Sequence, residues 1–333
     1  MRRGRPPERP GRPAPFRFMM PSMRLLRTAL AALRTVVTYA FVSLYILLVG
    51  PVALAVAFLF GWHRPLYVAA HGAVSVALRL AGIRMIVNGA EQVTPAQPTL
   101  YCVNHASNVE PPILFAALRS IGTRLKIVYK EELRRLPILG RGFEVVGFVP
   151  INRRDREQST RAIERAAAQA RAGDSFLMFP EGTRSVTGEL LPFKMGAFLL
   201  AVRAQVRIVP VAIAGADRAM RKGSPLIWPT TVRVHFGEPV TTAGLGVESR
   251  HALRDIARER VAQLLADAKT CLRLAGGVAK ATQAGRGLWP RAVGRSRRVR
   301  RTRPTMMGGT PRRGVRSAFS RAPEETTWTG SSR

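Results

Sequence analysis

The feature that most constrains this chain is a run of 27 residues, from Val36 to Trp62, that contains no charged side chain. A helix needs ~20 predominantly apolar residues to cross a bilayer, so the run is long enough to enter a membrane. It is too long for the apolar part of a secretion signal, and we expect it to remain in the mature protein. The alternative is a helix buried in a soluble core, but such a helix rarely needs so long an uncharged run.

Gly50 and Pro51 divide this run near its middle. Basic residues flank both of its ends: Arg27, Arg34, His63 and Arg64. A single straight span would place positive charge on both sides of the membrane, against the tendency of such residues to stay in the cytoplasm. The pattern therefore predicts two half-length helices, joined at Gly50 and Pro51, that enter one leaflet and return. We assign residues 35–82 to this membrane-anchoring region, in which a further helix over residues 64–83 links the anchor to the body.

The formal net charge of +33 points to an anionic partner, either a nucleic acid or a membrane surface. Much of the excess lies near the ends: residues 1–34 contain nine arginines and one glutamate, and residues 284–333 contain thirteen arginines and two glutamates. These ends have little to bury, so we expect basic, disordered extensions over residues 1–34 and 276–333. No recognised nucleic-acid-binding motif is present and aromatic residues make up only 7% of the chain, so we expect no nucleic-acid partner.

Cysteine and histidine are too scattered to suggest a metal centre. The two cysteines, Cys102 and Cys271, form neither a disulfide framework nor a Cys-x-x-Cys pair. No His-Glu-x-x-His segment and no cluster of cysteine and histidine occurs. We therefore expect no metal, and a folded part that is exposed to a reducing cytoplasm.

Between residues 83 and 275, apolar strand-like segments alternate with amphipathic helical ones. Strands are expected over residues 83–89, 99–104, 124–130, 144–151, 175–180, 206–213 and 231–237. Helices are expected over residues 111–120, 154–173 and 249–275. Strands that alternate with helices predict an α/β layered domain.

The segment "VNHASNVEPP" (103–112) places His105 five positions before Glu110. That step is wrong for one face of a helix but suits a strand-to-helix bend, and the two prolines fit a first helical turn. If Glu110 accepts a hydrogen bond from one ring nitrogen of His105, the other nitrogen is free to take a proton from a hydroxyl. The alternative, which the spacing alone favours, is that Glu110 or Asn108 caps the helix and His105 is simply packed.

A second polar turn, "FPEGTRS" (179–185), follows another predicted strand. Its glycine allows the backbone to approach a ligand closely, and its arginine can grip a phosphate with a rigid fork. For this peptide in isolation, a plain β-turn with solvated charges is the simpler interpretation.

Taken together, these segments resemble the glycerolipid acyltransferases, typified by bacterial 1-acyl-glycerol-3-phosphate acyltransferase. Four blocks follow the order of that family: "NHASNVEPP", "KEELRRLPILGRGFEVVGFVPINR" (130–153), "FPEGTRS" and "IVPVAI" (208–213). The segment "PFKMGAF" (192–198) also lies where the family has a Lys-x-Gly-Ala stretch. The resemblance covers residues 83–240. It has one departure, because the first block of the family nearly always ends in aspartate and here ends in Glu110.

The resemblance implies a layered acyltransferase domain over residues 83–275. It implies transfer of a fatty acyl group from acyl-CoA or acyl-carrier protein, as co-substrate, to the free hydroxyl of lysophosphatidate, making phosphatidate for phospholipid biosynthesis. His105 would be the general base and Glu110 would orient it. Substrate-binding roles would fall to Arg153 and Arg184 at the phosphate and to Glu181 and Gly182 at the glycerol. Thr183 would also bind substrate, and Lys130 and Lys194 are further candidates for contact with the phosphate.

Two groups of alternatives stay open at this point. The acceptor could be glycerol-3-phosphate or a lyso-aminolipid, because the sequence blocks do not separate these enzymes. From a different class, the chain could be a noncatalytic membrane-binding homologue if Glu110 abolishes the chemistry. The resemblance implies no cofactor, and with the apolar run it predicts the cytoplasmic face of the inner membrane.

Overall fold

The computed structural model describes residues 21–285 of the chain. Residues 1–20 and 286–333, where most of the two basic extensions were expected, lie outside the described residues. The expectation of disorder is wrong for residues 21–34 and 276–285, because helix α1 spans Pro21–Phe60 and helix α8 spans Arg250–Gly285. The arginines of residues 21–34 alternate with leucine and alanine, and all three residue types favour helix.

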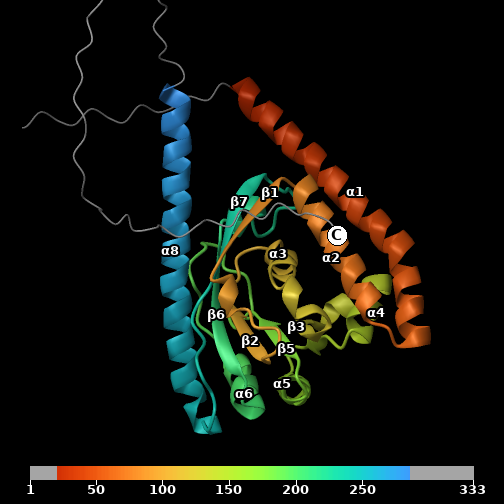
Figure 1. Cartoon of the computed structure of the whole chain (residues 1–333). Helices are drawn as coiled ribbons and strands as arrows, with labels where there is room; N and C mark the ends of the chain where they lie inside the picture. Colours follow the sequence, from red (N-terminus) through yellow and green to blue (C-terminus); the bar gives the residue numbers. More distant parts are fainter. Residues whose placement is uncertain (1–20, 286–333) are drawn as a thin grey trace, which may run out of the picture. The chain divides into compact units, whose positions relative to one another are not determined.

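A seven-stranded sheet lies at the centre of the described part of the chain (Figure 1). Its strand order is β1-β7-β6-β2-β5-β3-β4, and only the β6–β7 pair is antiparallel. The strands are β1 Ile83–Asn88, β2 Thr99–Val103, β3 Leu125–Lys130, β4 Val149–Ile151, β5 Ser175–Met178, β6 Arg207–Ala214 and β7 Thr230–Phe236. Parallel strands need crossover helices, which matches the predicted alternation.

Helices cover both faces of this sheet. Besides α1 and α8, they are α2 Arg64–Leu80, α3 Glu110–Ala117, α4 Pro137–Val145, α5 Arg156–Arg171, α6 Gly196–Ala204 and α7 Ala216–Ala219. Short 3-10 turns span Ala90–Gln92, Arg119–Arg124, Glu131–Arg135 and Val247–Ser249. On β2, Tyr101 and Val103 pack with α2 and α3, whereas Leu100 and Cys102 pack with α5, α6 and α8. This alternation follows from the two-residue period of a strand and confirms the α/β layered domain.

One predicted strand is wrong over most of its length. Residues 144–151 were expected to be extended, but α4 continues to Val145 and β4 covers only three residues. Gly147 separates the two elements with φ of +76°, a left-handed conformation that glycine adopts without strain. The residues Glu144 and Val145 thus belong to the end of α4, although the composition of the segment also suits a strand.

The predicted break at Gly50 and Pro51 is also wrong, because α1 continues through both residues. Proline removes one backbone donor and can bend a helix without ending it, and α1 changes direction in its C-terminal part (Figure 1). A Cβ on Gly50 would lie 2.6 Å from Cγ2 of Ile138 in α4. The glycine therefore serves close packing between helices. The chain turns back only at residues 61–63, where α2 begins its return alongside α1.

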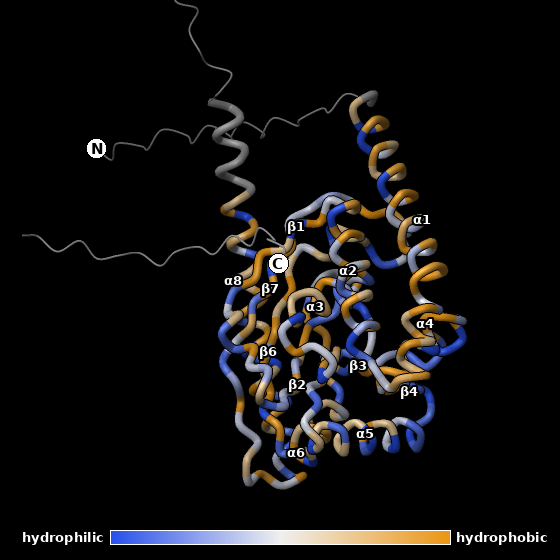
Figure 2. Tube along the Cα trace, turned by 45° about the vertical axis from the view of Figure 1, so that its right-hand side comes forward, coloured by the Kyte–Doolittle hydropathy of each residue, from blue (hydrophilic) through white to orange (hydrophobic). Residues whose placement is uncertain are grey.

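Helix α1 packs on the body through small residues and exposes large apolar ones. Its buried residues are Ala31, Thr35, Thr38, Ala53 and Ala57. Its exposed apolar residues include Leu25, Leu26, Leu47, Leu48, Phe58, Leu59 and Phe60, and orange segments follow the helix in Figure 2. By length and composition, Met23–Phe60 could cross a membrane. The helix therefore has one face for the body and another that is suited to lipid.

Candidate active site

The site lies where two neighbouring parallel strands end. Strand β2 leads into the bend that carries His105, and β5 leads into the loop of residues 179–185. Because β2 and β5 pair in parallel, their carboxyl ends meet at the same edge of the sheet. Such edges are where open α/β sheets bind ligands.

His105 and Glu110 form the hydrogen-bonded pair that the family resemblance implies. Nδ1 of His105 lies 2.7 Å from Oε2 of Glu110. The backbone N–H of Ala106 donates to both carboxyl oxygens, at 3.0 and 2.9 Å. Glu110 is the first residue of α3 and is fully buried, whereas the His105 side chain is 14% exposed. The longer glutamate therefore reaches the ring without difficulty, and Nε2 is the nitrogen left for a substrate.

Burial keeps His105 neutral. Desolvation of the imidazolium lowers the pKa of His105 from 6.5 to about 4, and the positive charges of Arg153, Arg184 and Lys222 act in the same direction while Glu181 opposes them. Burial raises the pKa of the Glu110 carboxyl to about 8, even though its backbone hydrogen bonds and Arg184 lower it, so the pair shares one proton between Oε2 of Glu110 and Nδ1 of His105. With the proton on Nδ1, the free Nε2 can act as a general base.

The loop after β5 holds His105 from three sides. The His105 N–H donates to Oε1 of Glu181 at 2.7 Å, and the His105 carbonyl accepts from the Ser185 N–H at 2.7 Å. The ring of Phe179 stacks on the imidazole with centroids 4.2 Å apart. The base is thus fixed at its backbone and at its ring by a segment 74 or more residues later in the chain.

Glu181 is engaged by backbone rather than open to a substrate. Its second oxygen, Oε2, accepts from the Leu191 N–H at 3.1 Å, and the residue is only 2% exposed. Burial raises its pKa to about 7, and the two backbone N–H donors oppose that shift. The resemblance implies that Glu181 helps to shape the glycerol site. The geometry instead makes it a residue that positions His105.

Three of the predicted basic residues, Arg153, Arg184 and Lys194, belong to this loop or contact it. Arg153 follows β4, and its Nη1 donates to the Gly182 carbonyl. Gly182 has φ of +70°, and a Cβ there would meet the Lys194 side chain at 2.9 Å. The Arg184 side chain is half-buried and Thr183 is exposed. The Lys130 Nζ lies 2.9 Å from a carboxylate oxygen of Glu132, so it is already paired.

Three further residues at this site were not predicted from the sequence. The Asn104 side chain bridges to β6, accepting from the Ile213 N–H at 2.8 Å and donating to its carbonyl at 3.1 Å. Ser107 donates to the Met220 carbonyl at 2.7 Å. Lys222 donates through Nζ to the Arg184 carbonyl at 2.9 Å. Asn104 could have been identified from the sequence, because it directly precedes His105 in the first block. No local pattern identifies Ser107 or Lys222 as residues of the site.

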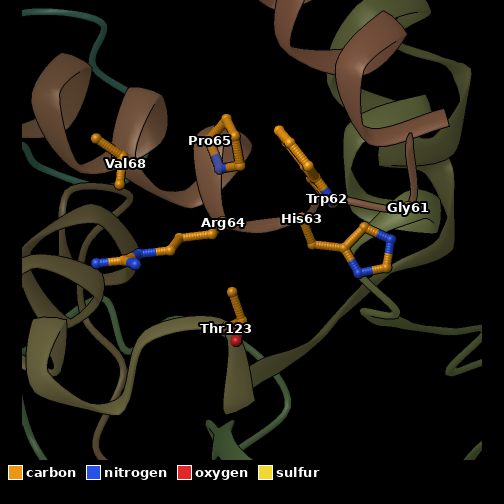
Figure 3. Close-up of a pocket in the computed structure, with 7 residues that line it drawn as sticks. All are labelled: Gly61, Trp62, His63, Arg64, Pro65, Val68 and Thr123. Carbon is orange, nitrogen blue, oxygen red and sulfur yellow. The ribbon is translucent and has the colours of Figure 1, made fainter. Parts of the chain in front are cut away.

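A hollow of about 760 Å³ lies elsewhere, at the turn between α1 and α2 (Figure 3). It is lined by Gly61, Trp62, His63, Arg64, Pro65, Val68 and Thr123. None of the predicted site residues lines this hollow. We therefore assign the candidate active site to the bend that carries His105. Within residues 21–285, no group of three or more His, Cys, Asp or Glu side chains is placed to hold a metal ion.

The chain is similar to several known proteins. Residues 84–214 match the Acyltransferase family. The 1-acyl-sn-glycerol-3-phosphate acyltransferase alpha of Mus musculus is 31% identical over 211 residues, which cover 61% of this chain and 73% of that protein. The chloroplastic 1-acyl-sn-glycerol-3-phosphate acyltransferase BAT2 of Brassica napus is 33% identical over 144 residues, which cover 43% of this chain and 41% of the relative.

A solved structure shares the fold. The crystal structure of the 1-acyl-sn-glycerophosphate (LPA) acyltransferase PlsC from Thermotoga maritima superposes with a TM-score of 0.64 at 26% sequence identity. The match covers 73% of this chain and 98% of that one.

Proposed function

Because this chain belongs to the 1-acyl-sn-glycerol-3-phosphate acyltransferase family, we propose that it transfers a fatty acyl group to the free hydroxyl of lysophosphatidate and so forms phosphatidate. The observation that carries the proposal is the hydrogen bond of 2.7 Å between Nδ1 of His105 and Glu110, with Arg153 and Arg184 in electrostatic reach of the imidazole. A base next to fixed positive charge suits an acceptor that has both a hydroxyl and a phosphate.

The reaction can proceed by direct transfer. Nε2 of His105 takes the proton of the acceptor hydroxyl while its oxygen bonds to the carbonyl carbon of the acyl thioester. The carbon–sulfur bond then breaks, and the leaving thiolate receives the proton from the imidazolium. Glu110 keeps Nδ1 protonated and stabilises the imidazolium as it forms. A positioned base of this kind contributes ~10²–10⁴-fold to the rate.

The acceptor phosphate would bind Arg184 and Arg153. Both charges act on His105, so both lie within electrostatic reach of the reacting hydroxyl. Arginine binds phosphate through two parallel N–H donors, which adds orientation to affinity. Lysophosphatidate and glycerol-3-phosphate both satisfy this requirement, whereas a lyso-aminolipid without a phosphate does not.

The acyl donor would be acyl-CoA or acyl-carrier protein, as the family resemblance implies. Both are cytosolic thioesters, so the site would face the cytoplasm. The apolar outer face of α1 supports attachment to a membrane. Trp62 and Arg64, at the α1–α2 turn, are residue types that favour the lipid–water boundary. We propose that the protein lies at the cytoplasmic face of the inner membrane.

Acyl transfer by the purified full-length protein tests this proposal. The protein in detergent micelles is given oleoyl-CoA or acyl-carrier protein as donor and lysophosphatidate, glycerol-3-phosphate or a lyso-aminolipid as acceptor, and products are identified by mass spectrometry. We expect phosphatidate from lysophosphatidate. The variant His105→Ala should lose nearly all transfer, while His251→Ala, which changes an exposed histidine on α8, should keep it. No product from any acceptor with either donor would indicate a noncatalytic homologue.

A further inference from the structure

Residues 220–228, between α7 and β7, begin at the active site. The Ser107 hydroxyl donates to the Met220 carbonyl at 2.7 Å, which ties the start of this segment to the bend that carries His105. Two residues later, the Lys222 Nζ donates to the Arg184 carbonyl at 2.9 Å. The segment therefore packs on both loops of the site.

The other end of the same segment contacts α1. The Ile227 N–H donates to Oγ1 of Thr35 at 2.9 Å, and both residues are buried. The Tyr39 hydroxyl donates to the Pro225 carbonyl at 3.2 Å. Residues 220–228 thus connect the helix with the apolar outer face to the reacting base. A lipid acceptor that leaves the bilayer beside α1 would meet this segment on its way to His105.

Lys222 adds a third positive charge to the opening of the site. It acts electrostatically on His105 in the same direction as Arg153 and Arg184, and the three come from three separate loops. Lysine carries three N–H donors on Nζ, and the bond to the Arg184 carbonyl uses one of them. The side chain is exposed, so the other donors can reach a ligand.

The acidic side chains beside His105 do not cancel this charge. Glu110 and Glu181 are buried, and their oxygens accept hydrogen bonds from backbone N–H groups and from His105. Among the described residues, no ion pair joins Arg184 or Lys222 to a carboxylate. A phosphate monoester carries about −1.5 to −2 charges near neutral pH, more than a single arginine neutralises.

We propose that Lys222 binds the phosphate of the acceptor together with Arg153 and Arg184, and that its segment holds it between α1 and the base. This inference rests on the proposed function. Lysine acts here as a mobile point charge, which complements the fixed forks of the two arginines. Specificity for a phosphorylated acceptor is then distributed over three loops, of which one is attached to the anchor helix.

Steady-state kinetics of full-length variants test the inference. In Lys222→Gln, an amide donor remains for the Arg184 carbonyl but the charge is lost. We expect the KM for lysophosphatidate to rise about ten- to hundredfold, with the donor KM and kcat nearly unchanged. Lys222→Arg should restore most of the affinity. The matched control is Arg221→Ala, which removes an exposed charge from the neighbouring position and should leave the KM for lysophosphatidate unchanged.

Inhibition by inorganic phosphate gives a second measurement. Its inhibition constant should rise in Lys222→Gln and stay constant in Arg221→Ala. An unchanged KM and inhibition constant in Lys222→Gln would overturn the inference, and so would equal losses for donor and acceptor or equal effects of both substitutions. A parent protein that forms no phosphatidate would instead reject the proposed function, which separates the two failures.

Discussion

Protonation of His105 should set the acid limit of the reaction, because only the neutral ring can accept a proton. Burial lowers its pKa from 6.5 to about 4. Activity is therefore lost as the pH falls through the lowered pKa and is fully present above it. We expect kcat/KM, which reports groups of the free enzyme, to stay level near neutral pH and to decline toward a midpoint near the lowered pKa of about 4. A midpoint near 8 would mean that the pair retains the proton of Glu110, whose pKa burial raises.

Glu181 offers a second test at a single residue. The change Glu181→Gln keeps the shape but replaces one acceptor oxygen by an NH₂ group that faces a backbone N–H. The backbone of His105 must then shift, and a misplacement of ~1 Å can lower turnover by up to ~10²-fold. We expect kcat to fall by at least about tenfold with little change in the KM for lysophosphatidate. A raised KM with unchanged kcat would show that the carboxylate contacts the acceptor after all.

The spacing of His105 and Glu110 allowed a hydrogen-bonded pair but by itself favoured a helix cap, and the family resemblance was what pointed to the pair. The sequence did not predict the hydrogen bonds of Glu181 or the place of Lys222. These depend on which backbone groups β5, β6 and the segment 220–228 bring together, and no local pattern encodes that. The resemblance indicated that Glu181 belongs to the site, and only the three-dimensional contacts separate positioning from binding.

At the scale of elements, Gly50 gives a direct test of the α1–α4 contact. A Cβ at this position lies 2.6 Å from Cγ2 of Ile138 but 3.9 Å from its Cβ. Gly50→Ala should therefore destabilise the protein by about 1–3 kcal/mol, the usual cost of overpacking. In Gly50→Ala with Ile138→Ala the clash is absent, so the double variant should be more stable than the sum of the two single changes implies. Thermal unfolding in detergent measures the coupling, and strict additivity would contradict the contact.

The same contact explains why the helix boundary was mispredicted. Glycine followed by proline usually ends a helix, and that local preference favoured a break. In the folded chain, α4 packs against Gly50 and α2 packs along α1, so tertiary contacts favour the continuous helix. The strands and helices of the body were predicted more accurately, because their apolar patterns follow the periods of the elements that they form.

At the scale of the whole molecule, α1 lies along the body instead of extending away from it. Its contacts with the remainder of the described chain include Thr35, Tyr39, Tyr45 and Gly50, which cover the middle of the helix. A helix that crossed the bilayer over residues 36–60 would carry α2 and α4 into the hydrocarbon with it. The exposed basic side chains of those two helices oppose such a position. We therefore expect α1 to lie in one leaflet, with its apolar outer face toward the lipid.

Cysteine labelling in intact bacterial cells tests this topology. The parent protein for labelling carries Cys271→Ser, which removes the partly exposed native cysteine. Cys102 is kept because it is fully buried and out of reach of the reagent. Single cysteines replace Ala29, near the start of α1, and Glu91, in the body, and both positions are exposed. If α1 stays in the cytoplasmic leaflet, an impermeant maleimide should label neither site before permeabilisation and both afterwards. A helix that crosses the membrane would give labelling of Ala29→Cys alone in intact cells. Labelling of Glu91→Cys would place the active site on the side opposite to the cytosolic thioester, which the proposed reaction does not allow.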